Sequence, residues 1–153
     1  MILIREITIN DLTDNFFKLL SQLSGELKDY DKSDLWEKYM QMKPGIVTLV
    51  AIEDDGVRGT ATILIENKFL HCGSKVGHIE DVVVDQNIRT KGLGKDLIEK
   101  CIQIAADNKC YKVILDCEEN VVPFYAKCGF RPENYSMRRD RDGNKKKKRK
   151  KAN

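Results

Sequence analysis

The sequence lacks several features that would assign it to a common class of protein. Its 153 residues contain no run of about eighteen apolar residues, so no transmembrane helix is predicted. The first ten residues, MILIREITIN, have neither the basic flank nor the cleavage pattern of a secretory signal peptide. The five cysteines are odd in number and form no C-x-x-C pair, which disfavours a disulfide framework or a zinc site. We therefore expect a cytoplasmic protein with reduced thiols and no bound metal.

The net positive charge of the chain comes from one short segment. The formal net charge is +3, and the run 145–151 alone carries seven basic residues. Subtracting those seven charges from +3 leaves −4 for the rest of the chain, which disfavours a nucleic-acid enzyme with a basic binding face. Because this run has no apolar residue to bury, we expect a disordered basic tail over residues 141–153. Residues 1–140 form one expected domain, and the tail leaves a nuclear location open.

Hydrophobic periodicity predicts an α/β domain with a mixed central sheet and flanking helices. The expected order is a strand, two helices, a β-hairpin, and then strand, helix, strand, helix and strand. Turn and cap residues such as Ser24-Gly25, Pro44-Gly45 and Asp54-Asp55-Gly56 separate these segments. The expected strands cover 2–9, 45–52, 57–66, 77–84, 111–117 and 135–139, and the expected helices cover 12–23, 35–42, 93–108 and 121–127.

The segment 77–95, GHIEDVVVDQNIRTKGLGK, combines a buried strand with a glycine-containing exit into a helix. Gly92 and Gly94 allow close approach of the backbone, and the unpaired N–H groups of a helix N-terminus attract phosphate. The segment is not a P-loop, because Arg89 stands five residues before Gly94 and Asp96 follows the lysine. A dinucleotide fingerprint is also incomplete here. The sequence thus predicts a phosphate or pyrophosphate site of another kind.

The pattern Arg-x-x-Gly-x-Gly over 89–94 resembles the pyrophosphate loop of the GNAT N-acetyltransferases, which grips acetyl-CoA. Together with 77–84, 110–117 and 124–130, it resembles the branch of that family that acetylates glucosamine 6-phosphate, over nearly the whole chain. The resemblance implies the GNAT fold, with splayed central strands that admit the pantetheine arm. It also implies acetyl transfer from acetyl-CoA to the amine of glucosamine 6-phosphate by direct attack in a ternary complex, on the route to UDP-N-acetylglucosamine.

The resemblance assigns Tyr125 to the departing thiolate. A phenol with an ordinary pKa of about 10 is protonated at neutral pH and can donate to sulfur. A backbone N–H near Val82 is expected to polarise the thioester carbonyl. In the family an asparagine that contacts CoA precedes the equivalent of Tyr125, but that position is Val121 here and Asn120 lies one residue earlier, so either the turn is re-registered or the contact is lost. The expected cofactor-binding residues are Val82, Val83, Val84, Arg89, Thr90, Lys91, Gly92, Leu93, Gly94, Lys95 and Tyr125.

Adjacent carboxylates at Glu80 and Asp81 interrupt an apolar strand. Side chains alternate along a strand, so we expect these two to point to opposite faces and not to share a proton. The resemblance implies that both contact the sugar, as does Asp116 at the end of the next strand. The catalytic residues are then Tyr125, Asp116 and Glu80, and the sequence leaves open which carboxylate acts as the general base.

For the sugar phosphate, the resemblance implies cations on two segments. Lys68 and His71 match a Lys-x-x-His pair before the central strand. An arginine of the last strand reaches the neighbouring subunit's site in a homodimer, and it is Arg138 or, alternatively, Arg139. The expected substrate-binding residues are Ser24, Lys68, His71, Glu80, Asp81, Asp116 and Arg138.

Two other functions compete with acetylation of an amino sugar. A related GNAT enzyme acting on protein N-termini or lysines would share 89–94 and Tyr125, but would not need Glu80, Asp81 and Asp116 together. A non-enzymatic binding module that its basic tail directs to a partner would explain the run 145–151, although such a run is equally explained as a solvated appendage.

Overall fold

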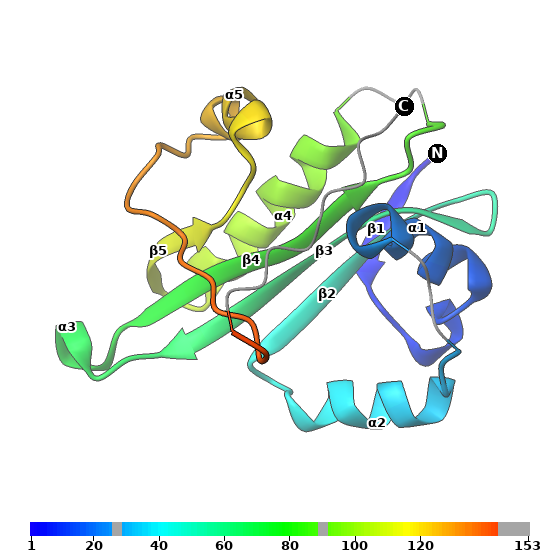
Figure 1. Ribbon diagram of the computed structural model, residues 1–153, viewed down its shortest axis with the longest axis horizontal. Helices are drawn as coiled ribbons and strands as arrows, with labels where there is room; N and C mark the ends of the chain where they lie inside the picture. Colours follow the sequence, from blue (N-terminus) through cyan, green and yellow to red (C-terminus); the bar gives the residue numbers. More distant parts are fainter. Residues whose placement is uncertain (26–28, 89–91, 144–153) are drawn as a thin grey trace. The chain divides into compact units, whose positions relative to one another are not determined.

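The computed structural model describes residues 1–25, 29–88 and 92–143 (Figure 1). It divides into two compact units, Met1–Glu118 and Glu119–Asn153, which are described separately here. Arg89, Thr90 and Lys91 of the expected pyrophosphate loop lie outside the described residues, as does the expected basic tail from residue 144 onward. Within the described ranges, none of the helices is both long enough and apolar enough to cross a membrane.

The first unit is built on a five-stranded mixed sheet with the strands in chain order, β1-β2-β3-β4-β5 (Figure 1). The pairs from β1 to β4 are antiparallel, and β4 pairs with β5 in parallel. This confirms the fold class expected from the sequence. The strands are β1 (Leu3–Glu6), β2 (Ile46–Glu53), β3 (Gly56–Asn67), β4 (Lys75–Val84) and β5 (Cys110–Leu115).

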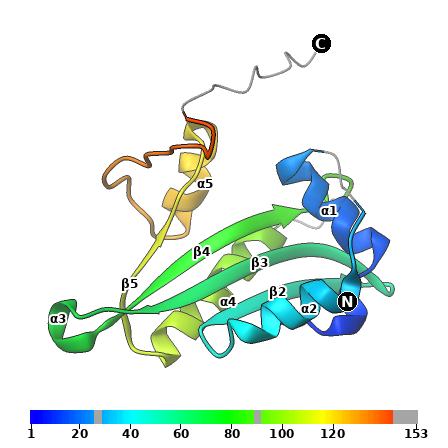
Figure 2. The ribbon, with the colours of Figure 1, turned by 60° about the horizontal axis from the view of Figure 1, so that its bottom comes forward.

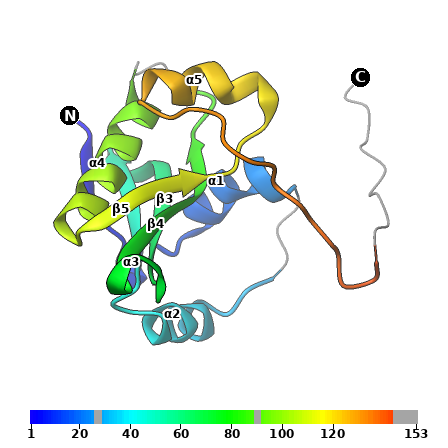
Figure 3. The same cartoon turned by 90° about the vertical axis from the view of Figure 1, so that its left-hand side faces the viewer.

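Helices cover both faces of the sheet, with α4 on one face and α1 and α2 on the other (Figures 2 and 3). The cap of α1 is Thr13, whose hydroxyl accepts a hydrogen bond from the Phe16 N–H at 3.3 Å, and the cap of α2 is Asp31. The first helix thus begins two residues later, and the second three residues earlier, than the sequence predicts. The helices are η1 (Ile9–Asp11), α1 (Asp14–Ser24), α2 (Lys32–Gln41), α3 (Leu70–Gly73) and α4 (Leu93–Asp107).

The apolar faces predicted for the helices pack against the two faces of the sheet and form the two halves of the core. Toward α1, the buried side chains come from the N-terminal segment, β2, β3 and β4. Toward α4, a glycine lets helix and sheet approach closely: a Cβ at Gly77 would lie 3.2 Å from Ile63 Cδ1 and 3.3 Å from Ala105 Cβ. The α1-side core consists of Ile7, Leu12, Phe16, Phe17, Leu19, Val50, Val57 and Val83.

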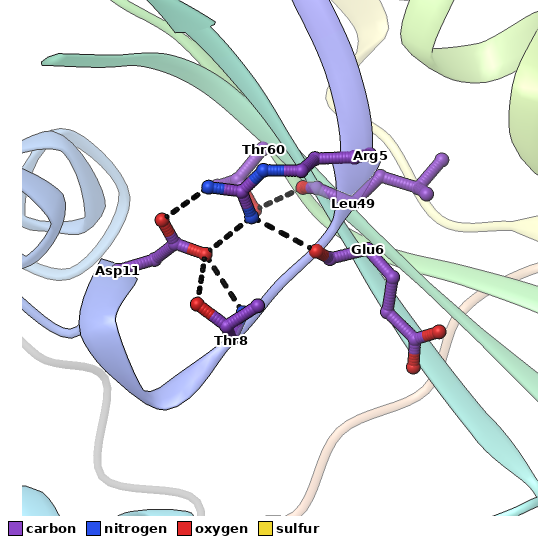
Figure 4. A network of polar contacts seen from close by, with 6 residues as sticks. All are labelled: Arg5, Glu6, Thr8, Asp11, Leu49 and Thr60. Carbon is purple, nitrogen blue, oxygen red and sulfur yellow. Dashed lines mark hydrogen bonds and ion pairs between the residues drawn. The ribbon is translucent and has the colours of Figure 1, made fainter. Parts of the chain in front are cut away.

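A buried carboxylate ends β1 earlier than the sequence predicts (Figure 4). Asp11 accepts two hydrogen bonds from the Arg5 guanidinium, at 2.7 and 2.8 Å. It also accepts from the Thr8 N–H at 2.7 Å and the Thr8 hydroxyl at 3.1 Å. These bonds turn the chain into η1 after Glu6, so the strand expected over 2–9 is only four residues long.

We expect Asp11→Asn to lower the free energy of unfolding by about 1–3 kcal/mol, because charge-assisted hydrogen bonds to a buried group are lost. The hydrogen bonds from Arg5 hold the pKa of Asp11 below its usual value. A lowered pKa in the folded state stabilises the protein above the unfolded-state pKa of about 4, and this stability is lost as pH falls through the folded-state pKa. Urea unfolding from pH 7 to 3 should therefore show the difference from wild type shrinking below pH about 4. Asp34→Asn, which breaks an exposed ion pair with Lys38, should change stability by less than about 1 kcal/mol.

The second unit contains η2 (Glu119–Val121), α5 (Val122–Lys127) and an irregular segment that follows them. Gly129, with φ of +93°, ends α5, and the Phe130 N–H returns to the Tyr125 carbonyl at 3.0 Å. The strand expected over 135–139 is wrong: no strand forms there in the described part of the chain, and only Asp140 and Gly143 make an isolated bridge. An extended segment needs a neighbouring strand, and within this unit 135–139 has none.

Candidate active site

A β-bulge shapes the centre of β4. Glu80 pairs with Thr62 and Val83 pairs with Thr60, so Asp81 and Val82 together stand opposite one residue of β3. Asp81 adopts a positive φ of +51°, which is uncommon for a residue other than glycine. The bulge interrupts the alternation of side chains, and it does so at the two acidic residues singled out in the sequence.

The two carboxylates consequently do not point to opposite faces, and that prediction is wrong. Glu80 faces the same side as its cross-strand partner Thr62. Asp81 lines a cavity on the α1 side together with Thr62 and Thr60. The bulge therefore presents both acids on the α1 side of the sheet. This cavity has a volume of about 260 Å³ and its wall is mostly apolar, with Phe16, Leu20, Leu35, Trp36 and Tyr39 among its lining residues.

Beside the bulge, β4 and β5 separate. Their parallel ladder runs from Lys75–Cys110 to Ile79–Leu115 and ends there, while β4 continues to Val84. The half of β4 from Glu80 onward is therefore not paired with β5. Such a gap between parallel strands leaves backbone groups of β4 for a bound molecule, as the splayed strands of the predicted fold require. The Val83 side chain is buried in the α1-side core, so only its backbone remains for a ligand.

Three carboxylates meet where the strands separate. Asp116 follows the last residue of β5 and is exposed, as are Glu80 and Asp81. Loss of surrounding water raises the pKa of Glu80, and the negative charges of Asp81 and Asp116 raise it further, while His78 acts in the opposite direction. We call this group, Glu80, Asp81 and Asp116, the acid cluster, because the charges of the two aspartates act on Glu80. Negative charge at this point attracts a cation such as an ammonium group.

The N-terminus of α4 lies beyond the other end of the unpaired half of β4. Gly92 caps the helix with φ of +89°, a conformation that favours glycine, and among the described residues other than its chain neighbours no atom lies within 4 Å of the position of its missing Cβ. Leu93 is buried and anchors the first turn, whereas Lys95 is exposed and lies 3.7 Å from Glu99. The first N–H groups of a helix have no intrahelical acceptor. Gly92, Leu93 and Gly94 thus form an open, anchored helix start suited to an anion.

Lys68 and His71 lie at the opposite end of β4, next to α3 (Figure 1). Lys68 donates to Glu66 at 2.6 Å, and the His71 ring packs on Tyr111 with 4.6 Å between ring centroids. About five strand residues, or roughly 15 Å, separate this end of β4 from Glu80. The α3 end of β4 is thus apart from the acid cluster, and the role of Lys68 and His71 toward the sugar phosphate stays a prediction.

The remaining predicted residues occupy three different places. Ser24 is the exposed last residue of α1. Tyr125 lies in α5 of the second unit, half-buried, with its ring edge-on to Phe124 and Phe130 at 4.9 and 6.0 Å. Arg138, in the same unit, is exposed and pairs with Asp140 at 2.7 Å.

Comparisons with known proteins agree with this geometry. Residues 9–130 match the model of the acetyltransferase (GNAT) family. A glucosamine 6-phosphate N-acetyltransferase of Arabidopsis thaliana is 37% identical over 138 residues, which cover 88% of this chain and 93% of that protein. The chain belongs to this family. Within this family, its similarity is to the glucosamine 6-phosphate N-acetyltransferases.

Two further comparisons give the same result. The glucosamine 6-phosphate N-acetyltransferase of Trypanosoma brucei brucei is 48% identical over 103 residues, covering 66% of this chain and 70% of that protein. The crystal structure of the Arabidopsis thaliana enzyme superposes with a TM-score of 0.85 at 36% identity, covering 93% of this chain and 99% of that one. The fold and the family expected from the sequence are both confirmed.

Sequence reasoning missed one polar group beside the acid cluster. Glu66 on β3 accepts from Lys68 through one carboxylate oxygen and contacts His78 Nε2 through the other at 2.7 Å. Neither Glu66 nor His78 is among the site residues expected from the sequence. Glu66 and His78 lie twelve residues apart on paired strands, so the register between β3 and β4 alone could have predicted their contact. In the part of the chain that the structure describes, no group of three or more His, Cys, Asp or Glu could hold a metal ion.

Proposed function

We propose that this protein transfers the acetyl group of acetyl-CoA to the amine of glucosamine 6-phosphate, giving N-acetylglucosamine 6-phosphate and CoA. The observation that carries the proposal is the acid cluster. It lies at the bulge, where β4 separates from β5, and β4 leads from there toward the glycine-capped start of α4. The similarity to proteins named glucosamine 6-phosphate N-acetyltransferase supports the choice of acceptor.

In this proposal the diphosphate of acetyl-CoA binds the first turn of α4 at Gly92, Leu93 and Gly94. The pantetheine arm lies along the half of β4 that β5 leaves unpaired. Backbone N–H groups around Val82, in the bulge, polarise the thioester carbonyl, because preorganised donors stabilise the charge that develops on its oxygen. Arg89, Thr90 and Lys91 complete the phosphate site.

The acceptor arrives as an ammonium ion, and the acid cluster draws it in and holds the sugar hydroxyls. After loss of a proton, the amine nitrogen attacks the thioester carbon, a C–N bond forms and the C–S bond breaks. The departing thiolate takes a proton or a hydrogen bond from the phenol of Tyr125. Glu80 and Asp116 are the candidates for accepting the proton of the amine, directly or through water.

The decisive experiment measures thiol release from acetyl-CoA with three acceptors: glucosamine 6-phosphate, unphosphorylated glucosamine and a lysine peptide. We expect glucosamine 6-phosphate to have the highest kcat/KM. Turnover of the lysine peptide alone would assign the chain to protein acetylation instead. Turnover of none of the three, with acetyl-CoA still bound, would reject an acetyltransferase acting on amino groups of this kind.

We further propose that the enzyme is a homodimer in which segment 131–139 completes the neighbouring site. Tyr135 and Met137 in this segment are 93% and 90% exposed, which is unusual for an aromatic and a large apolar side chain. An extended segment with such residues and no strand partner in its own unit suits a place in a neighbouring subunit. Its arginines, Arg138 or Arg139, would bring positive charge to the sugar phosphate there.

Arg138→Ala should therefore raise the KM for glucosamine 6-phosphate at least tenfold, since charge-assisted hydrogen bonds to phosphate are strong. Arg141→Ala, which removes an exposed arginine outside segment 131–139, is the control. Mixing Arg138→Ala and Asp116→Asn subunits, each of low activity at glucosamine 6-phosphate concentrations below the KM, should restore about a quarter of wild-type activity, because half of the dimers are mixed and each mixed dimer has one intact site. A fully active monomer in light scattering, or no recovery on mixing, would contradict the shared site.

A cytosolic location is our remaining proposal about where the enzyme acts. The five cysteines of the sequence are odd in number and form no C-x-x-C pair, which suits a reducing compartment.

A further inference from the structure

A polar group on the α1 side of β3 and β4 is not used by the mechanism above. His78 lies on β4 two residues before Glu80, and the register between β3 and β4 is regular over this stretch, with Leu64 opposite His78 and Thr62 opposite Glu80. Two residues apart on a regular strand means the same face, at a spacing of about 7 Å. The imidazole of His78 is therefore the nearest basic group on β4 to the Glu80 carboxylate.

Glu66 fixes the imidazole. Its Oε2 lies 2.7 Å from His78 Nε2, and its Oε1 accepts from Lys68 Nζ at 2.6 Å. Lys68 lowers the pKa of Glu66, and the hydrogen bond to His78 lowers it further, so Glu66 is a carboxylate at neutral pH. A carboxylate next to Nε2 orients the ring and requires a proton on Nε2. The His78 side chain is 28% exposed, so the contact is partly shielded from water.

The position of His78 matters because Glu80 lies among charged groups. Asp81 on β4 and Asp116 after β5 act on Glu80 with negative charge, and His78 acts on it with positive charge. The residue opposite on β3, Thr62, is uncharged. Asp81 and Asp116 oppose the ionised form of Glu80, and the positive charge of His78 favours it. Only the ionised form can attract the ammonium and accept its proton.

We propose that His78, held in place by Glu66, is a positioning residue that supplies the positive counterpart of the Glu80 carboxylate. It does not touch the substrate in this arrangement; it acts through Glu80. The inference rests on the proposed function, in which Glu80 works as a carboxylate, and it adds the pair Glu66–His78 to the residues that the reaction needs.

The test is the pH dependence of kcat/KM for glucosamine 6-phosphate in two variants of His78. His78→Gln can still hydrogen-bond Glu66 but cannot carry charge, so the acid limb of the profile should move to higher pH by about half a unit or more. His78→Lys keeps a positive charge and should not move the limb upward. In His78→Gln, activity lost near pH 6 should return at pH 8, with the KM for acetyl-CoA unchanged. If His78 only braces the hairpin, both variants will lose thermal stability and both will keep the wild-type acid limb.

A second variant and a direct titration keep the inference testable if His78→Gln folds poorly. Glu66→Gln should move the acid limb in the same direction, whereas Asp34→Asn, which breaks an exposed ion pair on α2, should leave it in place. Carbon-13 NMR of labelled glutamate, with Glu80 assigned from Glu80→Gln, should show Glu80 titrating at higher pH in the Glu66 and His78→Gln variants. An unshifted Glu80 would overturn the inference while wild-type turnover stands. Absence of turnover in the wild type would reject the proposed function, and the NMR titration would still decide the role of His78.

Discussion

Replacing Tyr125 by phenylalanine should lower kcat by about 10²–10⁴-fold while leaving the KM for acetyl-CoA nearly unchanged. General-acid assistance typically contributes a factor of that size. The departing sulfur acquires negative charge only as the C–S bond breaks, so a phenol that serves it binds the transition state more strongly than the ground state. Loss of such an interaction appears in kcat and not in KM. Steady-state thiol release, with each substrate varied in turn, measures both constants.

The structure supplies a matched control for this substitution. Tyr125→Phe keeps the ring that packs against Phe124 and Phe130, and Tyr30→Phe removes the same hydroxyl from a ring that packs on Phe17, outside the proposed site. Tyr30→Phe should have wild-type kinetics, and thermal unfolding of both variants separates any loss of folding from a loss of chemistry. If Tyr125→Phe retained wild-type kcat, the tyrosine would be a packing residue and the thiolate would need another donor.

The sequence predicted the parts of the fold that depend on local pattern. The helical spacing of apolar residues in 93–108 is observed as α4, and the β-branched run of 77–84 is observed in β4. Gly92 has the positive φ that explains why a glycine stands there. Such features depend on periodicity and on the conformational freedom of single residues, and both can be read without knowledge of the neighbours.

Features that depend on two segments meeting could not be predicted in this way. The bulge at Asp81 arises from the register between β3 and β4, and a strand read alone appears to alternate. The strand expected over 135–139 failed for the same reason, because its hydrogen-bond partners would have to come from outside its own unit. The contact between Glu66 and His78 likewise follows from the pairing of two strands. The residue types of the site could be predicted from the sequence, and their relative directions could not.

Asp116→Asn is expected to have the second large effect, and its pattern should differ from that of Tyr125→Phe. Asp116 follows β5 at the point where β4 and β5 separate, and it acts on the sugar and its amine in the proposed mechanism. A charge-assisted hydrogen bond contributes about 1.5–3 kcal/mol. We therefore expect kcat/KM for glucosamine 6-phosphate to fall about 10- to 100-fold, with a higher KM for the sugar as well as a lower kcat, and with the KM for acetyl-CoA unchanged.

The same variant makes a second prediction whose sign follows from the charges. The negative charge of Asp116 raises the pKa of Glu80, so its removal should lower that pKa. The acid limb of kcat/KM should then move to lower pH, opposite to the shift expected for His78→Gln. Glu118→Gln, which neutralises an exposed carboxylate two residues further along the chain, is the control and should leave the profile and both KM values as in wild type. If Asp116→Asn lowered kcat alone and left the KM for the sugar unchanged, Asp116 would act only in the transition state. A general-base role would then replace the binding role given to it here, because a base accepts its proton only as the amine attacks.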